Sequence, residues 1–159
     1  QTLRFLKKHI RVTADGWEYE GDPKHAETLL LKFGCESARP VNSPGVQEPE
    51  SEENQVPLTA AEHAEYRSGA GLFQYIAEDR ADLKFSTKEL LRDASGPTAL
   101  SNKKLKLMVR YIAGTPRVVN TCPWLDKHDE KMIDVLIYSD ADFAACLKTR
   151  RSTRCGVVQ

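Results

Sequence analysis

The stretch Thr59-Ala-Ala-Glu-His-Ala-Glu-Tyr-Arg-Ser-Gly-Ala-Gly-Leu-Phe-Gln-Tyr-Ile-Ala77 decides how the middle of the chain folds. Thr59 and Glu62 have the spacing of a capping box, in which each side chain accepts a hydrogen bond from the other residue's backbone N–H, for about 1 kcal/mol. Four largely apolar residues then recur at helical spacing on one side: Tyr66, Ala70, Phe73 and Ala77. We therefore expect a heavily buried helix here.

Two more helices are predicted after this one. The first spans about Ala81 to Ala94, and Ser95-Gly96-Pro97 ends it. Its predicted inward residues are Leu83, Thr87, Leu90 and Leu91, and its predicted outward bases are Lys84, Lys88 and Arg92. The second helix begins after the cap Thr98 and ends at Gly114, with an apolar stripe made by Leu105, Met108, Val109 and Ile112.

Three bases, Lys103, Lys106 and Arg110, stand opposite that stripe at i, i+3 and i+7, and we call them the basic row. A row of bases on one helical face is usually a solvated face. The alternative is contact with a phosphate backbone. Because the chain's 23 basic and 23 acidic side chains cancel, no bulk field draws the whole molecule toward nucleic acid, so the argument depends on such local clusters.

The first part of the chain predicts a β-hairpin and a helix. Leu3 to Val12 and Trp17 to Glu20 flank an Asp15-Gly16 pair, which supplies the positive dihedrals of a tight turn. The helix is expected to start with Asp22 as N-cap and Pro23 as its first residue, and to end at Gly34 as a left-handed cap. Its buried stripe is predicted to contain Ala26, Leu29, Leu30 and Phe33.

Residues 39–57 have no apolar period. They contain four prolines and an acidic run, made by Pro40, Pro44, Pro49 and Pro57 with Glu48, Glu50, Glu52 and Glu53. We interpret this stretch as a solvated linker or a long surface loop.

From Arg117 onward the pattern is typical of strands. Met132 to Tyr138 reads as a strand covered on at least part of both faces, and a second strand is expected to begin near Ser152. Because the chain starts without Met and stops inside this second strand, we expect a piece cut from a longer protein, with an incomplete last domain.

Two carboxylates, Asp140 and Asp142, stand where the hydrophobic strand ends, and they lie on the same side if the strand continues. Two acids in such a place suit magnesium, although an acid pair that ends a strand is more often a turn former. Since Ala141 separates them, they are not the Tyr-x-Asp-Asp of a polymerase palm.

The cysteines and the hydropathy exclude several classes of protein. Cys35, Cys122, Cys146 and Cys155 are widely spaced, and the four histidines have no zinc-finger spacing, so we expect reduced intracellular thiols and no zinc. The sequence contains no run of 18 apolar residues and no signal peptide, so no membrane is expected. We expect an intracellular chain, in the cytoplasm or the nucleus.

Several of these stretches resemble one family in the order in which they occur. Tyr138 to Thr153, with its Asp-x-Asp and its Arg-Arg-Ser-Thr, resembles the opening of the RNase H domain of copia-type (Pseudoviridae) retrotransposon Pol polyproteins. Four earlier stretches are similar to the reverse transcriptase that precedes that domain: Ile10 to Ala26, Asn42 to Gly45, Tyr66 to Asp82 and Arg110 to Thr115.

The resemblance implies an α+β chain that runs from the reverse transcriptase into the start of RNase H. Residues 1–38 would end the palm and begin the thumb, 39–57 would be an acidic Pro-rich linker, 58–116 the helical thumb and connection, and 117–159 the first strands of a truncated RNase H-like mixed sheet. The palm aspartates would lie before Gln1 and the other RNase H carboxylates after Gln159.

The resemblance also implies roles for particular residues. Asp140 matches the first metal-binding carboxylate of RNase H, with Asp142 as the fallback, and the complete parent enzyme would use Mg²⁺. The basic row would contact an RNA/DNA hybrid or a primer-template, and the other partners would be the remaining Pol segments. The fragment itself is expected to be inactive. The rival interpretation is a non-catalytic nucleic-acid-binding or interaction module derived from such an element.

This chain departs from the family pattern at several positions. Ala81 stands where the family has Pro, Ala145 where it has Gly, and Arg154-Cys155 where it has Ser-Gly. Alanine continues a helix well, whereas loss of a turn glycine causes strain wherever φ is positive. These departures are typical of a decayed copy or a divergent lineage.

Overall fold

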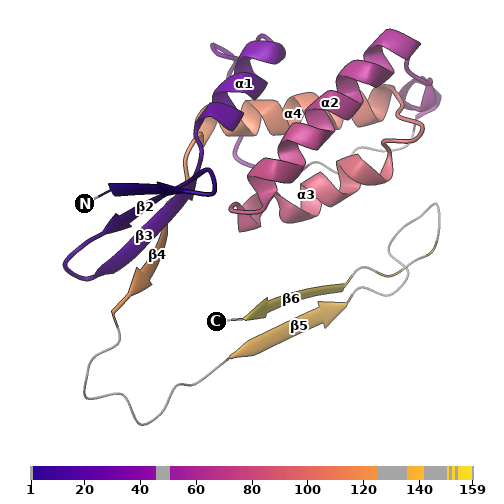
Figure 1. Ribbon diagram of the computed structural model, residues 1–159. Helices are drawn as coiled ribbons and strands as arrows, with labels where there is room; N and C mark the ends of the chain where they lie inside the picture. The colour runs from indigo at the N-terminus through magenta and orange to yellow at the C-terminus, as the bar shows by residue number, and fades with distance from the viewer. Residues whose placement is uncertain are drawn as a thin grey trace. The chain divides into compact units, whose positions relative to one another are not determined.

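The computed structural model describes residues 2–45, 51–124, 136–141, 150, 152 and 154–158. It consists of two compact units, Gln1–Pro123 and Trp124–Gln159, and each is described by itself. The first unit carries helices and a four-stranded sheet, and the second a two-stranded sheet (Figure 1). The predicted α+β class is confirmed. Within the described residues, no helix is long and apolar enough to cross a membrane.

The helices of the first unit are α1 (Lys24–Lys32), α2 (Ala60–Ala77), α3 (Ala81–Arg92) and α4 (Ala99–Gly114). The predicted capping box starts α2, since Glu62 N donates to Thr59 Oγ1 at 3.4 Å and Thr59 N donates to Glu62 Oε2 at 2.9 Å. One core joins all four helices, and its largest fully buried side chains include Leu29, Tyr66, Phe73, Leu83, Leu90, Leu105, Met108 and Ile112.

Packing between α1 and α2 is close enough to require a glycine. A Cβ at Gly69 would lie 2.7 Å from Cζ of Phe33 and 3.1 Å from a methyl carbon of Leu105. Leu105 is fully buried, and Phe33 is half-buried and packs against the core, so neither ring nor methyl group moves away freely. Gly69 therefore lets α2 approach the end of α1.

The predicted inward faces of the helices are confirmed with one exception. Leu83, Thr87 and Leu90 of α3 are buried, but Leu91 is 36% exposed. Adjacent residues point about 100° apart on a helix, so a narrow stripe that contains Leu90 turns Leu91 toward solvent. The outward prediction for Lys84, Lys88 and Arg92 is confirmed.

An antiparallel sheet flanks the helices, in the order β1 (Thr2–Phe5), β2 (Lys8–Val12), β3 (Gly16–Gly21) and β4 (Asn120–Pro123). The predicted hairpin is present, with Val12 opposite Trp17 and Thr13 N donating to Gly16 O at 2.9 Å. The positive φ expected of the Asp15-Gly16 pair is wrong, because the turn forms with negative φ at both residues. The expectation of one strand over Leu3 to Val12 is wrong. The chain reverses at Leu6 (φ 47°) and Lys7 (φ 60°), a turn that normally takes Asn or Gly.

The ends of α1 lie close to their predicted places. The cap position is taken by Pro23 and not Asp22, although Asp22 Oδ1 accepts a hydrogen bond from Lys24 N at 3.1 Å. Gly34 has the predicted left-handed conformation, with φ 59°. A shift of one residue at a helix start is within the usual spread of boundary assignment.

Strand β4 brings a distant part of the chain to the N-terminal hairpin. Gly16 pairs with Pro123 and Trp17 with Cys122. The backbones approach so closely that a Cβ at Gly16 would lie 2.2 Å from Cys122 O. Residues 120–123 therefore pack with the first unit.

The predicted domain bounds stay a prediction, because contacts do not say from which parental domain a segment comes.

The second unit contains β5 (Ile137–Ala141) paired antiparallel with β6 (Arg154–Val158). The predicted second strand is thus present, beginning at Arg154. Residues 132–135 of the predicted first strand lie outside the described residues. Every residue of β5 is exposed, so the described part of this unit does not supply the cover that the apolar run predicts.

Candidate nucleic-acid interface

The basic row lies along the side of α4 that faces away from the core. Lys103 and Lys106 are exposed and Arg110 is half-buried, whereas Leu105, Met108, Val109 and Ile112 fill the opposite side. The structure therefore gathers the three predicted bases on one face of a helix whose other face is fixed by packing.

Two of the three bases hold a neighbouring segment. Lys103 Nζ donates to Asn54 Oδ1 at 2.8 Å, and Arg110 Nε donates to the carbonyl oxygen of Arg39 at 2.9 Å. Lys106 makes no hydrogen bond or ion pair within the described part of the chain, and its charge is one minor cause of the lowered pKa of Glu62, after the hydrogen bonds from Thr59. No local pattern in the sequence indicates these tethers, because they join residues far apart in the chain.

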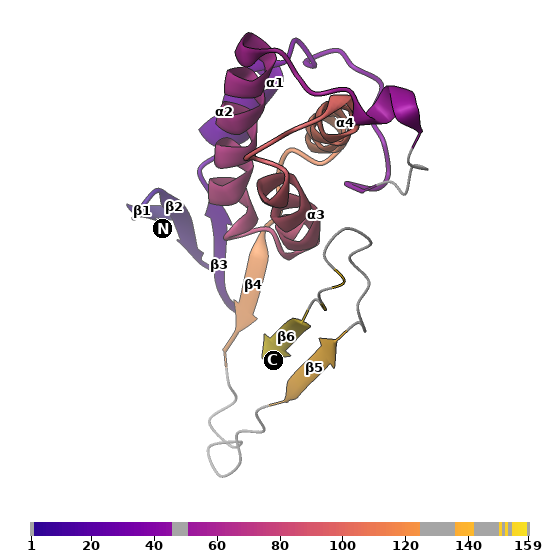
Figure 2. The same cartoon turned by 90° about the vertical axis from the view of Figure 1, so that its right-hand side faces the viewer.

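The tethered segment, residues 39–45 and 51–57, is called the strap. Near the C-terminal end of α4, a Cβ at Gly114 would lie 2.8 Å from Cβ of Pro40. Near the N-terminal end, Ala99 N donates to Val56 O at 2.8 Å and Leu58 N to Pro97 O at 3.1 Å. The strap carries a short 3-10 helix, η1 (Glu52–Gln55), which lies beside α4 (Figure 2). The described parts of the acidic stretch thus form a surface loop fastened to α4 at both ends.

The tethers fix the bases without neutralising them. An amide oxygen and a carbonyl oxygen carry no net charge, so Lys103 and Arg110 keep their full positive charges. Glu52 and Glu53 of η1 are exposed, and neither forms an ion pair within the ranges that the structure describes. The row is therefore an ordered set of cations.

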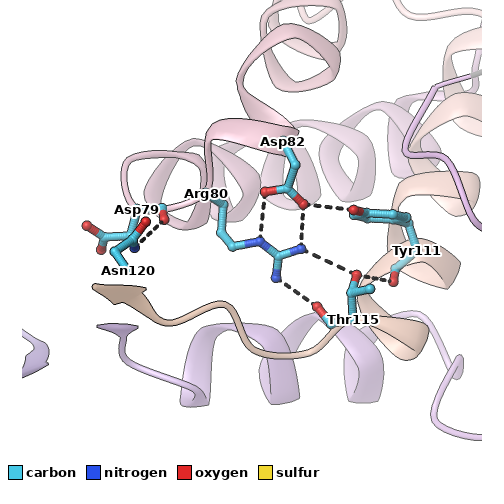
Figure 3. A network of polar contacts seen from close by, with 6 residues as sticks. All are labelled: Asp79, Arg80, Asp82, Tyr111, Thr115 and Asn120. Carbon is cyan, nitrogen blue, oxygen red and sulfur yellow. Dashed lines mark hydrogen bonds and ion pairs between the residues drawn. The ribbon is translucent and has the colours of Figure 1, made fainter. Parts of the chain in front are cut away.

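A second polar cluster joins two of the motif stretches (Figure 3). Arg80 is 5% exposed, and it donates from Nε to Asp82 Oδ1 at 2.9 Å and from Nη2 to Asp82 Oδ2 at 2.7 Å. Its Nη1 donates to Thr115 O at 2.7 Å. Tyr111 completes the cluster by donating from its hydroxyl to Asp82 Oδ2 at 2.9 Å.

This network is built to hold elements together. It connects the start of α3 to the end of α4, and the hydrogen bonds from Arg80 and Tyr111 keep the pKa of Asp82 below its usual range. Nearby, Lys8 and Asn120 attach β2 and β4 to the turn between α2 and α3, since Lys8 Nζ donates to Asp79 Oδ1 at 2.5 Å and Asn120 Nδ2 to Asp79 O at 3.2 Å. The polar groups of this network form hydrogen bonds with one another, which indicates a structural role.

A cavity of about 220 Å³ lies between the sheet and the helices. Several charged side chains that line it are paired with one another, Lys8 with Asp79 and Arg117 with Glu20. Arg117 donates two hydrogen bonds to Glu20, at 2.8 and 2.9 Å, which lowers the pKa of that buried carboxyl. Because these four side chains pair with one another, their charges are used within the protein.

The candidate metal ligand Asp140 lies in the second unit, on β5. Its side chain is exposed, Oδ1 accepts a hydrogen bond from Ala141 N at 2.8 Å, and its cross-strand neighbour is Cys155. Asp142 lies outside the described residues. Among the residues that the structure describes, no three His, Cys, Asp or Glu side chains lie together as a metal site. One exposed carboxylate does not fit a pair of magnesium ions, because two-metal sites need acids from several elements.

The chain is similar to proteins of transposable elements. No family model matches it, and no solved structure matches it significantly. An uncharacterized mitochondrial protein of Arabidopsis thaliana is 27% identical over 152 residues, which are 94% of this chain and 59% of that protein. Retrovirus-related Pol polyproteins from the Arabidopsis thaliana transposons RE1 and RE2 are 33% and 31% identical, each over 73% of this chain and 8% of the polyprotein.

The chain therefore spans 59% of the first of these relatives and only 8% of the two polyproteins. The predicted resemblance is confirmed: the chain is a relative of copia-type retrotransposon Pol polyproteins and matches a short part of their length.

Proposed function

We propose that this chain is a nucleic-acid-contacting segment of a reverse transcriptase and RNase H polyprotein, and that it is catalytically incomplete by itself. Its partners would be an RNA/DNA hybrid or primer-template and the other segments of the polyprotein. The observation that carries the proposal is the basic row, in which three cations with unneutralised charges stand on one fixed helical face.

The dimensions of the row suit a phosphate backbone. Arg110 stands seven positions after Lys103, and at about 1.5 Å per residue the row extends over about 10 Å of helix axis. Double-stranded DNA carries one negative charge per about 1.7 Å, so several phosphates fall within that length. Phosphate is also a stronger acceptor for an ammonium or guanidinium group than the neutral oxygens that Lys103 and Arg110 now meet.

The test replaces the row by Lys103→Gln, Lys106→Gln and Arg110→Gln and measures binding of a fluorescent RNA/DNA hybrid at several salt concentrations. We expect about a tenfold or greater loss of affinity at low salt, and a salt slope smaller by about one for each lost contact. The matched control removes the same charge from other helices, through Lys24→Gln, Arg67→Gln and Lys84→Gln, all exposed bases. Equal losses in the two variants would reduce the row to ordinary surface charge.

The proposed role of Asp140 is the first metal-binding carboxylate of the parental RNase H domain, with Asp142 as the fallback. Mg²⁺ would then belong to the complete parent, where further acids join Asp140. We expect no magnesium-dependent cleavage of an RNA/DNA hybrid by this chain alone. Robust cleavage that Asp140→Asn abolishes would overturn the claim that the chain is incomplete.

A second candidate function is a non-catalytic nucleic-acid-binding or interaction module kept from such an element. It is favoured by the contrast between the basic row and Asp140, which no other metal-binding side chains join among the described residues. The flanking DNA distinguishes the two functions. An upstream Tyr-x-Asp-Asp coding run and a downstream acid-bearing helix in the same frame support the polyprotein segment, whereas stop codons on both sides support the module.

A further inference from the structure

The strap contacts both ends of the face that the row would offer to a nucleic acid. Asn54 is buried against α4 and holds Lys103, while Arg39 at the other end holds Arg110 through its carbonyl oxygen. A phosphate backbone that follows the row from Lys103 to Arg110 meets the strap at both of these residues. A phosphate backbone at the row therefore competes with the strap for the donors of Lys103 and Arg110, although each side chain keeps further N–H groups.

The strap also brings negative charge to the row. Glu52 and Glu53 directly precede Asn54, whose side chain meets Lys103. Consecutive Cα atoms are about 3.8 Å apart, so the backbones of both glutamates lie within about 8 Å of the Asn54 Cα atom. The Debye length is about 8 to 10 Å at moderate salt, so acids this close in the chain to the Asn54 tether are expected to reduce the positive potential at the start of the row.

We infer that the strap is an intramolecular competitor of nucleic acid, which engages both ends of the basic row through neutral tethers and uses Glu52 and Glu53 to repel the phosphate backbone. This inference rests on the proposed contact between the row and nucleic acid. The strap is displaceable because its tethers end on neutral oxygens, whose exchange for phosphate favours the nucleic acid. The two glutamates oppose that exchange because they repel the phosphates. They therefore raise the affinity that a polyanion needs in order to displace the strap.

The competitor is tested by Glu52→Gln with Glu53→Gln in the full chain, using the same fluorescent RNA/DNA hybrid. Glutamine has nearly the size of glutamate. Because both side chains are exposed, the substitutions leave no buried group unpaired. We expect the hybrid to bind about three- to tenfold more tightly at low salt, with the gain shrinking as salt rises. The matched control is Asp15→Asn with Glu27→Gln, which removes two exposed acids from the hairpin turn and α1. The control should stay close to the original affinity.

The double variant is then combined with the row variant Lys103→Gln, Lys106→Gln and Arg110→Gln. If the strap competes for the row, removal of its acids gives no gain once the row is gone. An equal gain in both backgrounds would overturn the inference, since it would reflect net charge alone. The same holds if the double variant behaves like the Asp15 and Glu27 control.

The two proposals fail in different ways. If the row variant loses affinity but the Glu52 and Glu53 variant gains none, the strap is no competitor and the row still binds nucleic acid. If the row variant binds as tightly as the original chain, the row is no contact, and the competitor falls with it. Circular dichroism of each variant checks that its helices are intact.

Discussion

The helical unit and the β5–β6 pair both carry residues of the family motifs, but they use them differently. Arg80, Asp82, Tyr111 and Thr115 are joined to one another in a half-buried network between α3 and α4. Asp140 on β5 is exposed, and its one described hydrogen bond comes from its own neighbour, Ala141 N. The comparison teaches that similarity to a family motif does not separate a structural residue from a chemical one, whereas burial and partners do.

The largest expected effect is the loss of the buried guanidinium. Arg80→Met keeps much of the side-chain stem but removes the charged donor from the Asp82 carboxylate, which retains the Tyr111 hydroxyl, and from the Thr115 carbonyl. We expect unfolding in urea to become easier by about 3 kcal/mol. The matched substitution in the other unit is Asp140→Asn, whose side chain is exposed and which should change stability by less than about 0.5 kcal/mol. Similar losses from both would erase the distinction between the two regions.

A smaller effect is expected from the packing of the helical unit. Gly69→Ala places a methyl group 2.7 Å from Cζ of Phe33, and overpacking of this kind costs about 1 to 3 kcal/mol. Gly71, on the same helix, has open space around the added methyl, so Gly71→Ala should stabilise α2 by about 0.5 to 1 kcal/mol. Thermal unfolding of the pair gives the answer, and two shifts of the same sign would contradict the predicted close contact.

The same change tests how loosely the second unit is packed. A methyl at Gly156 of β6 would lie 3.6 Å from Tyr138 O, an ordinary contact. Gly156→Ala is therefore expected to change the stability of the β5–β6 pair little, in contrast to Gly69→Ala in the helices, and thermal unfolding measures both.

Local signals in the sequence predicted much of the helical unit. The capping box at Thr59, the left-handed Gly34 and the buried stripes depend on neighbours a few residues away, and they are present in the structure. The turn at Leu6 and Lys7 was missed, because two ordinary residues with positive φ carry no signal. Its conformation follows from the pairing of β1 with β2.

Contacts between distant residues could not be predicted in this way. The pairing of β3 with β4 and the bond between Arg80 and Thr115 depend on which surfaces meet after the helices pack. For the candidate interface, helical periodicity gave the basic row and its exposed face, but not the strap. The hydrogen bonds from Lys103 to Asn54 and from Arg110 to Arg39 join residues that no local pattern connects.

The smallest expected effect is in the acid dependence of the network. Hydrogen bonds from Arg80 and Tyr111 lower the folded-state pKa of Asp82, so its contribution to stability is fully present above the unfolded value of about 4 and is lost as the pH falls through the folded value. Asp82→Asn removes this titration. The difference in unfolding free energy between the original chain and the variant should therefore be constant near neutral pH and shrink below about pH 4. Asp22 and Glu20 also have lowered pKa values, so only the difference between the original chain and the variant isolates Asp82. A difference that stays constant to low pH would mean that the network gives the Asp82 carboxylate no preference for its charged form.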